Sequence, residues 1–134
     1  MKELNYAGPV EDNTLTKDEL RIVKQAAKDL EILRHRCYVN AQRLAMYCEG
    51  DEILYHEGTF GGFLAHAWNS INGKLVDISC GVEQIVPAEC YHMYVPHGTY
   101  TKRDIVANNI KNGMQWNWLG NAETMGEMHK EEAH

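Results

Sequence analysis

Residues 66–77 constrain the fold more than any other stretch of the chain. They read His-Ala-Trp-Asn-Ser-Ile-Asn-Gly-Lys-Leu-Val-Asp, two short runs on either side of Asn72-Gly73. Asn-Gly is preferred in two-residue hairpin turns, because both central residues of a type I′ turn need positive φ. We therefore expect an antiparallel hairpin over about 63–79, with Ile71 opposite Lys74.

The register of this hairpin brings a histidine and a carboxylate to one face. Counting outward from the turn places Trp68 opposite Asp77 and His66 opposite Ser79. Side chains alternate between faces along a strand, so these four residues project from the same face. His66 and Asp77 are then diagonal neighbours across the two strands, within reach of a hydrogen bond. A histidine oriented by a carboxylate is two thirds of a nucleophilic triad.

A candidate nucleophile precedes the hairpin. Cys37 falls at the start of a helical pattern over about 37–48, directly after Arg34-His35-Arg36. A helix N-terminus carries partial positive charge and unbonded N–H groups, which favour a thiolate. The same N–H groups, with Asn40 one turn on, can hold a developing oxyanion. The alternative is that Cys37 is a small buried core residue, the commonest fate of a cytosolic cysteine.

The predicted site therefore combines three residue types that acyl transfer by a thiol requires. Its catalytic residues are Cys37, His66 and Asp77, and its substrate-binding residues are Asn40 and Trp68. In such a triad the histidine takes the thiol proton, and the aspartate fixes the imidazole tautomer.

No metal or other cofactor is predicted. Cys90, His92 and His97 are the one cluster that suggests a metal site. Their spacing lacks the paired short ligand intervals of a structural zinc site, so this stays a minor alternative.

Length and composition favour a small single domain. The 134 residues carry a formal net charge of −6, which argues against a nucleic-acid partner. No run approaches the roughly 18 apolar residues of a membrane span, and the first residues lack the apolar core of a signal peptide. We therefore expect a cytoplasmic protein with reduced thiols and no membrane partner. The oligomeric state is left open.

The order of local patterns predicts an α+β fold, with N-terminal helices packed on a small antiparallel sheet. A capping box at Thr16–Glu19 opens a helix over about 17–34, and the residues from Thr101 to Asp104 can open another helix through about Asn112. Short strands are expected at 53–56, 82–86 and 91–95, besides the hairpin. Trp116 and Trp118 are expected to pack back on this single domain, 1–134, with 1–15 and 123–134 peripheral or frayed.

Together these residues resemble the transglutaminase-like branch of the papain-like cysteine hydrolases. His66-Ala67-Trp68 resembles the His-x-Trp strand of that branch, and the residues from Gly73 to Asp77 resemble its Gly-x-x-x-Asp partner. The resemblance covers roughly residues 34–80 and implies a papain-like core with Cys37 as nucleophile. The surroundings of Cys37 depart from the usual Gly-x-Cys-x-x-aromatic pattern. The small size would fit a phage or bacterial accessory protein.

The sequence supports two alternative functions. The first is a cysteine peptidase, deamidase or transglutaminase-like enzyme whose partner is a protein or peptide substrate. The second is a non-catalytic binding or inhibitory domain on the same scaffold, because a fold does not guarantee its chemistry.

Overall fold

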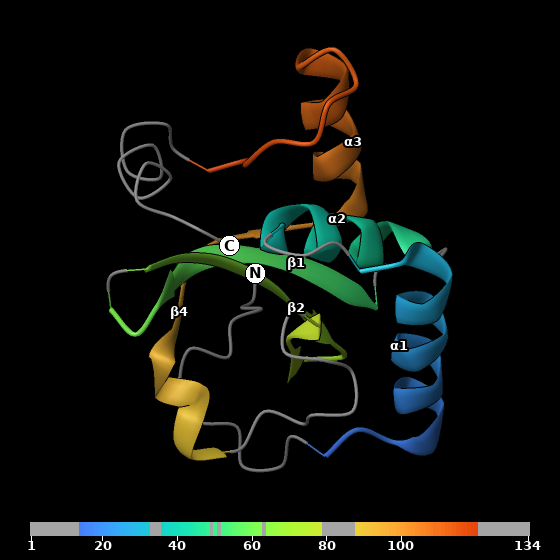
Figure 1. The fold of residues 1–134 in the computed structure, drawn as a ribbon, viewed down its shortest axis with the longest axis vertical. Coiled ribbons are helices and arrows are strands. Elements are labelled where there is room, and N and C mark those ends of the chain that lie inside the picture. Colours follow the sequence, from blue (N-terminus) through green and yellow to red (C-terminus); the bar gives the residue numbers. More distant parts are fainter. Residues whose placement is uncertain are drawn as a thin grey trace.

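The computed structural model describes residues 14–32, 36–48, 50, 52–62, 64–78 and 88–120 (Figure 1). Its helices are α1 (Lys17–Leu30), α2 (Cys37–Tyr47), the 3₁₀ helix η2 (Ala88–Met93) and α3 (Lys102–Lys111). Its strands are β1 (Ile53–Phe60), β2 (Leu64–Ile71), β3 (Lys74–Val76) and β4 (Tyr94–Tyr100), ordered β3-β2-β1-β4 in one antiparallel sheet. The predicted α+β class is confirmed. None of the described helices is long and apolar enough to cross a membrane.

The predicted hairpin turn is confirmed residue by residue. Asn72 and Gly73 have φ values of 51° and 84°, as a type I′ turn requires. Ile71 pairs with Lys74, and the next two pairs follow in the expected register. The register therefore places Asp77 on the side of the sheet that the sequence predicted. Ser79 and the strand expected at 82–86 lie outside the described residues.

One face of the sheet packs against α2. Asn69 on β2 donates from Nδ2 to the Ala41 carbonyl of α2 at 2.8 Å. Its partner on β1, Tyr55, accepts a hydrogen bond from Gln42 of α2 at 3.1 Å. The core on this face also holds Ala67 and other apolar residues of β1, β2 and β3. Because side chains alternate along a strand, the odd-numbered residues of β1 and β2 face the helix.

The opposite face carries a smaller, aromatic core. Trp68, Leu75, Tyr91 and Tyr94 are all buried there, and Phe60 packs against them. Each of the four strands contributes one of these residues, and Tyr91 comes from η2. We call this group the aromatic cluster.

α1 is tied to the tip of the hairpin through Glu19. The capping box predicted at Thr16 is present, with the Thr16 N–H donating to Glu19 Oε1 at 2.8 Å. Glu19 also accepts hydrogen bonds from Asn72 Nδ2 and Lys74 Nζ, each at 2.8 Å. Burial works to raise the pKa of Glu19, but these hydrogen bonds outweigh it and lower the pKa to about 2.

α1 ends at Leu30, four residues before the predicted boundary. Glu31 adopts a left-handed conformation with φ 58°, which stops the helix. The Arg43 side chain of α2 donates to the Leu30 carbonyl, so the helix end is satisfied by α2 rather than by another turn.

Two strand predictions were wrong in extent. β1 extends beyond the expected 53–56 as far as Phe60, with Gly58 inside the strand. A Cβ on Gly58 would lie 2.0 Å from the Val95 carbonyl oxygen of β4, so only glycine allows this approach. The strand expected at 91–95 begins at Tyr94, because η2 occupies the residues before it.

We expect Glu19→Gln to destabilise the fold by about 1–3 kcal/mol at pH 7. The folded-state pKa of Glu19 is about 2, below its ordinary 4.5, so its contribution is present above pH 4.5 and is lost as the pH falls toward 2. Urea unfolding of wild type and variant at pH 7 and pH 2.5 measures the difference, which should shrink at the lower pH. The exposed Glu52→Gln is the control and should show no such trend.

We expect Gly58→Ala to cost more than about 2 kcal/mol of unfolding free energy, because the clash is with backbone that cannot move alone. Gly73→Ala meets open space and is strained only by its positive φ, so it should cost about 1 kcal/mol. Denaturant midpoints of both variants measure this. Equal losses would show that β4 does not approach β1 as closely as described.

Candidate functional site

His66 and Asp77 meet as the hairpin register predicts. His66 Nε2 lies 2.8 Å from Asp77 Oδ2, and the Tyr94 hydroxyl donates to the same oxygen at 2.7 Å. A carboxylate oxygen accepts hydrogen bonds, so the imidazole proton sits on Nε2. Nδ1 is then the ring nitrogen that can take a proton. The pair has the chemistry of an oriented general base.

The aromatic cluster surrounds this pair. The His66 ring stacks with Trp68 at a centroid distance of 5.9 Å and an interplanar angle of 24°. Phe60 and Tyr94 lie at 5.6 and 6.0 Å on other sides of the imidazole. His66 is 8% exposed and Asp77 is 4% exposed. The predicted position of Trp68 beside the histidine is confirmed, and the site is shielded from water.

A second histidine lies on the same face. His56 of β1 lies opposite Trp68 in the sheet, and the two rings stack with their centroids 6.1 Å apart. Its Nδ1 lies 3.0 Å from Thr99 Oγ1 and its Nε2 lies 2.8 Å from Ser70 Oγ. Burial lowers the pKa of His56 to about 3, so the ring is neutral in the folded protein.

Cys37 begins α2 as predicted, but it does not meet His66. It is 2% exposed and belongs to the core on the helix-facing side of the sheet, with Ala67. Since Ala67 and His66 are consecutive residues of β2, their side chains project from opposite faces. The expectation that the N-terminus of α2 is directed at His66 is therefore wrong. Asn40 is buried on the same helix, which covers the face of the sheet opposite to His66.

Another thiol shares a face with His66. Cys90 of η2 is half-buried and packs against the aromatic cluster, whose Trp68 and Tyr94 also contact the His66 ring. Sequence reasoning gave Cys90 no catalytic role. The sequence signal that could have placed Cys90 on this face is the pair of tyrosines after it, because Tyr91 and Tyr94 both belong to the aromatic cluster.

A polar cluster lies on the helix-facing side, beneath α2. The Tyr55 hydroxyl donates to Glu57 Oε2 at 2.6 Å and accepts from Gln42. Burial raises the pKa of Glu57, against hydrogen bonds from Tyr55 and from the backbone near Leu119. Burial also raises the pKa of Tyr55, and nearby Glu57 and Cys37 act in the same direction. We call Gln42, Tyr55 and Glu57 the helix-side polar cluster.

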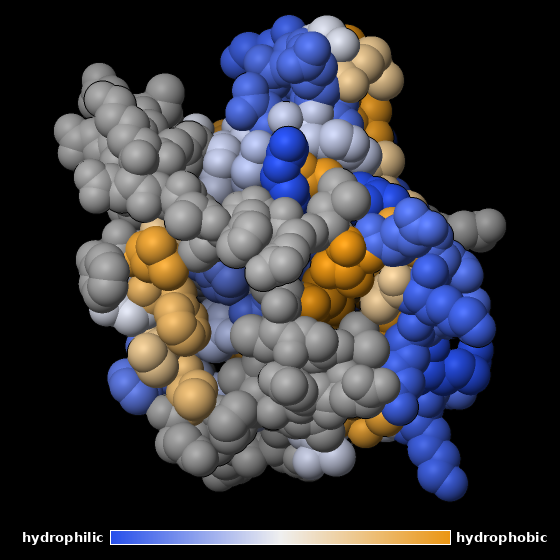
Figure 2. Space-filling view, viewed as in Figure 1, coloured by the Kyte–Doolittle hydropathy of each residue, from blue (hydrophilic) through white to orange (hydrophobic). Residues whose placement is uncertain are grey.

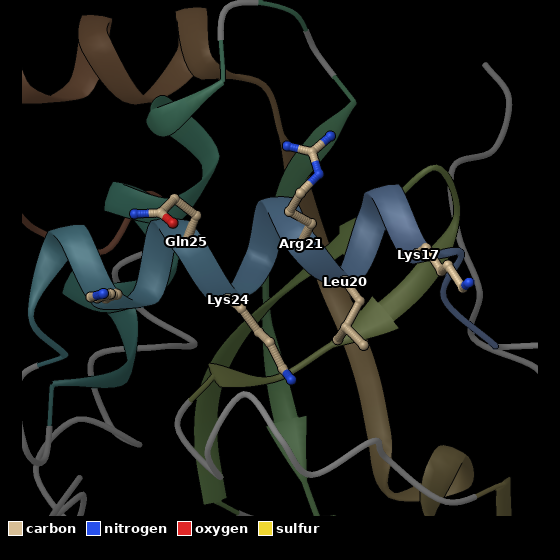
Figure 3. Close-up of a pocket in the computed structure, with 6 residues that line it drawn as sticks. Lys17, Leu20, Arg21, Lys24 and Gln25 are labelled. Atoms are coloured by element: carbon tan, nitrogen blue, oxygen red, sulfur yellow. The ribbon is translucent and has the colours of Figure 1, made fainter.

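A shallow hollow of about 410 Å³ runs along α1, lined by Lys17, Leu20, Arg21, Lys24, Gln25 and Lys28. In Figure 3, Leu20 and Lys24 project to one side of the α1 ribbon, and Arg21 and Gln25 project to the other. The hollow contains no predicted site residue. Across the part of the chain that the structure describes, no three His, Cys, Asp or Glu side chains form a group able to hold a metal ion.

Comparisons of the chain with protein-family models, with curated proteins and with solved structures return no match.

We expect the unfolding free energy to fall by about 2 kcal/mol between pH 7 and pH 5 through His56. Its folded-state pKa of about 3 lies below the ordinary 6.5, so only the unfolded chain takes up a proton as the pH falls below 6.5. His56→Gln should flatten this slope in urea unfolding, whereas His97→Gln, at an exposed position, should not. An unchanged slope in His56→Gln would contradict the burial of a neutral ring.

Proposed function

We propose that the protein is a cysteine-dependent acyl-transfer enzyme acting on an amide of a protein or peptide, with His66 as general base. The observation that carries the proposal is the 2.8 Å hydrogen bond between His66 and Asp77, reinforced by Tyr94. The buried carboxylate fixes the imidazole tautomer and stabilises its cation when a proton is taken up. The resemblance of these two strands to the His-x-Trp and Gly-x-x-x-Asp motifs of transglutaminase-like enzymes supports the same assignment.

Cys90 is the nucleophile that this geometry favours. It packs on the aromatic cluster that holds His66, whereas Cys37 lies on the other face of the sheet. Apolar surface extends over η2 and β4, where Val95 is 43% exposed (Figure 2). A peptide side chain can bind to such surface beside the thiol. The described cysteines are thiols rather than disulfides, which suits a reducing compartment such as the cytoplasm.

The reaction would proceed in two steps. His66 Nδ1 takes the Cys90 thiol proton, and the thiolate attacks the amide carbonyl carbon. The C–N bond then breaks, and the imidazolium returns the proton to the departing amine. Water, or a second amine, attacks the resulting thioester with His66 again as base, which restores the thiol. Water gives hydrolysis or deamidation, and an amine gives transfer.

Thiol reactivity and activity should be measured together in wild type, Cys90→Ala, Cys37→Ala and His66→Gln. We expect iodoacetamide to alkylate Cys90 fastest near neutral pH, and more slowly in His66→Gln. Mass spectrometry on peptide, isopeptide and glutamine substrates should show acyl adducts or one-dalton shifts. Cys90→Ala should lose at least about a thousandfold in rate, and Cys37→Ala should keep most of it.

The second candidate is a non-catalytic protein-binding domain. It is favoured by exposed apolar side chains on and after α3, namely Val106, Ile110 and Met114. If all four proteins behave alike on every substrate, the binding function is the better account. Loss of activity in Cys37→Ala but not in Cys90→Ala would overturn the choice of nucleophile and require α2 to approach His66.

A further inference from the structure

The chain folds back on itself after α3 in an extended segment, residues 115–120, which we call the C-terminal strap. It runs back beside α3 in Figure 1. Trp116, Trp118 and Leu119 pack against the core, as predicted for the two tryptophans. The Trp118 ring lies 4.9 Å from that of Tyr38 on α2, at 30°. The strap is thus held against the protein by apolar and aromatic side chains.

The carbonyl groups of the strap are bound by side chains from two helices. Gln42 of α2 donates from Nε2 to the Asn117 carbonyl at 2.8 Å. Asn108 of α3 donates more weakly to the carbonyls of Asn117 and Trp118, at 3.4 and 3.5 Å. These hydrogen bonds are made to the main chain and not to side chains, as in domains that bind extended peptides.

The N–H groups of the strap are bound by the sheet. The Leu119 N–H donates to Glu57 Oε2 at 2.6 Å, and the backbone of Gly120 also hydrogen-bonds the same carboxyl group. Glu57 is 1% exposed, so the strap reaches into the helix-side polar cluster. A buried carboxylate that accepts from consecutive backbone N–H groups is a specific receptor for an extended chain.

The strap does not use all the acceptors at this place. Glu57 Oε1 and Gln42 Oε1 are buried without a hydrogen-bond partner among the described residues. Buried polar atoms are normally paired, so each calls for a donor that the strap does not supply. A peptide with one more well-placed N–H or side-chain donor would satisfy them better than the strap does.

We propose that Tyr38, Gln42, Glu57 and Asn108 form a binding site for an extended peptide that carries an aromatic side chain, and that the strap occupies this site in cis. The aromatic ring packs at a tilt on Tyr38, and the following two residues donate their N–H groups to Glu57. The inference stands apart from the acyl-transfer proposal, because it uses none of His66, Asp77 and Cys90. A tethered segment competes at an effective concentration of about millimolar, so wild type should bind peptides weakly.

The test adds the strap sequence in trans. A fluorescein-labelled peptide Gln-Trp-Asn-Trp-Leu-Gly, a copy of residues 115–120, is titrated with full-length wild type and full-length Trp118→Ala. Fluorescence anisotropy should show binding to the variant at least about tenfold tighter than to wild type, because the strap no longer competes. A peptide N-methylated at the leucine nitrogen, which lacks the donor to Glu57, should bind at least about tenfold more weakly.

A second variant keeps the test valid if Trp118→Ala does not fold. Leu119→Pro removes the N–H that Glu57 accepts and leaves Trp118 in place, and it should also expose the site. Adding Glu57→Gln to a folded strap variant should weaken peptide binding by at least about fivefold. Absence of saturable binding by a folded variant up to 1 mM (about the effective concentration of a short tether), or equal binding of the N-methylated peptide, would overturn the proposal. Loss of the fold in both variants would also overturn it, because the strap would then be structural.

Discussion

Side chains on β2 alternate between two faces of the sheet, and the turn at Asn72-Gly73 fixes which residue faces which way. His66 and Trp68 lie on the aromatic face, while Ala67 and Asn69 lie against α2. A slip of one residue would exchange these two sets completely. The meeting of His66 with Asp77 follows from this register.

Local chemistry made half of the candidate site predictable. The Asn-Gly turn and the period of two along a strand are sufficient to bring His66 to Asp77, and the structure shows the bond. Which face α2 covers depends on contacts between residues far apart in sequence, such as Asn69 with the Ala41 carbonyl. No local pattern encodes that choice, so Cys37 was assigned to the wrong side of the sheet. The strand predicted at 53–56 was too short for a similar reason, since the close approach of Gly58 to β4 is a tertiary contact.

Polar groups are buried on both faces, and they serve different ends. On the aromatic face, Asp77 collects hydrogen bonds from His66 and Tyr94, an arrangement that prepares one ring nitrogen to accept a proton. On the helix-facing side, Glu57 and Gln42 bind the main chain of the strap, and each keeps one side-chain oxygen that no described residue hydrogen-bonds. Buried polar atoms are costly unless paired. The proposed catalysis rests on the first group, and the proposed binding of a peptide segment rests on the second.

The separation of Cys37 from His66 is tested most directly by ¹⁵N spectra of the histidine rings. In wild type, His66 should show its ring proton on Nε2, because Asp77 accepts there. His66→Gln assigns the signals. Cys90→Ala should shift the His66 ring resonances, and Cys37→Ala should leave them unchanged. The opposite pattern, a response to Cys37→Ala and none to Cys90→Ala, would contradict the placement of the two cysteines and with it the proposed active site.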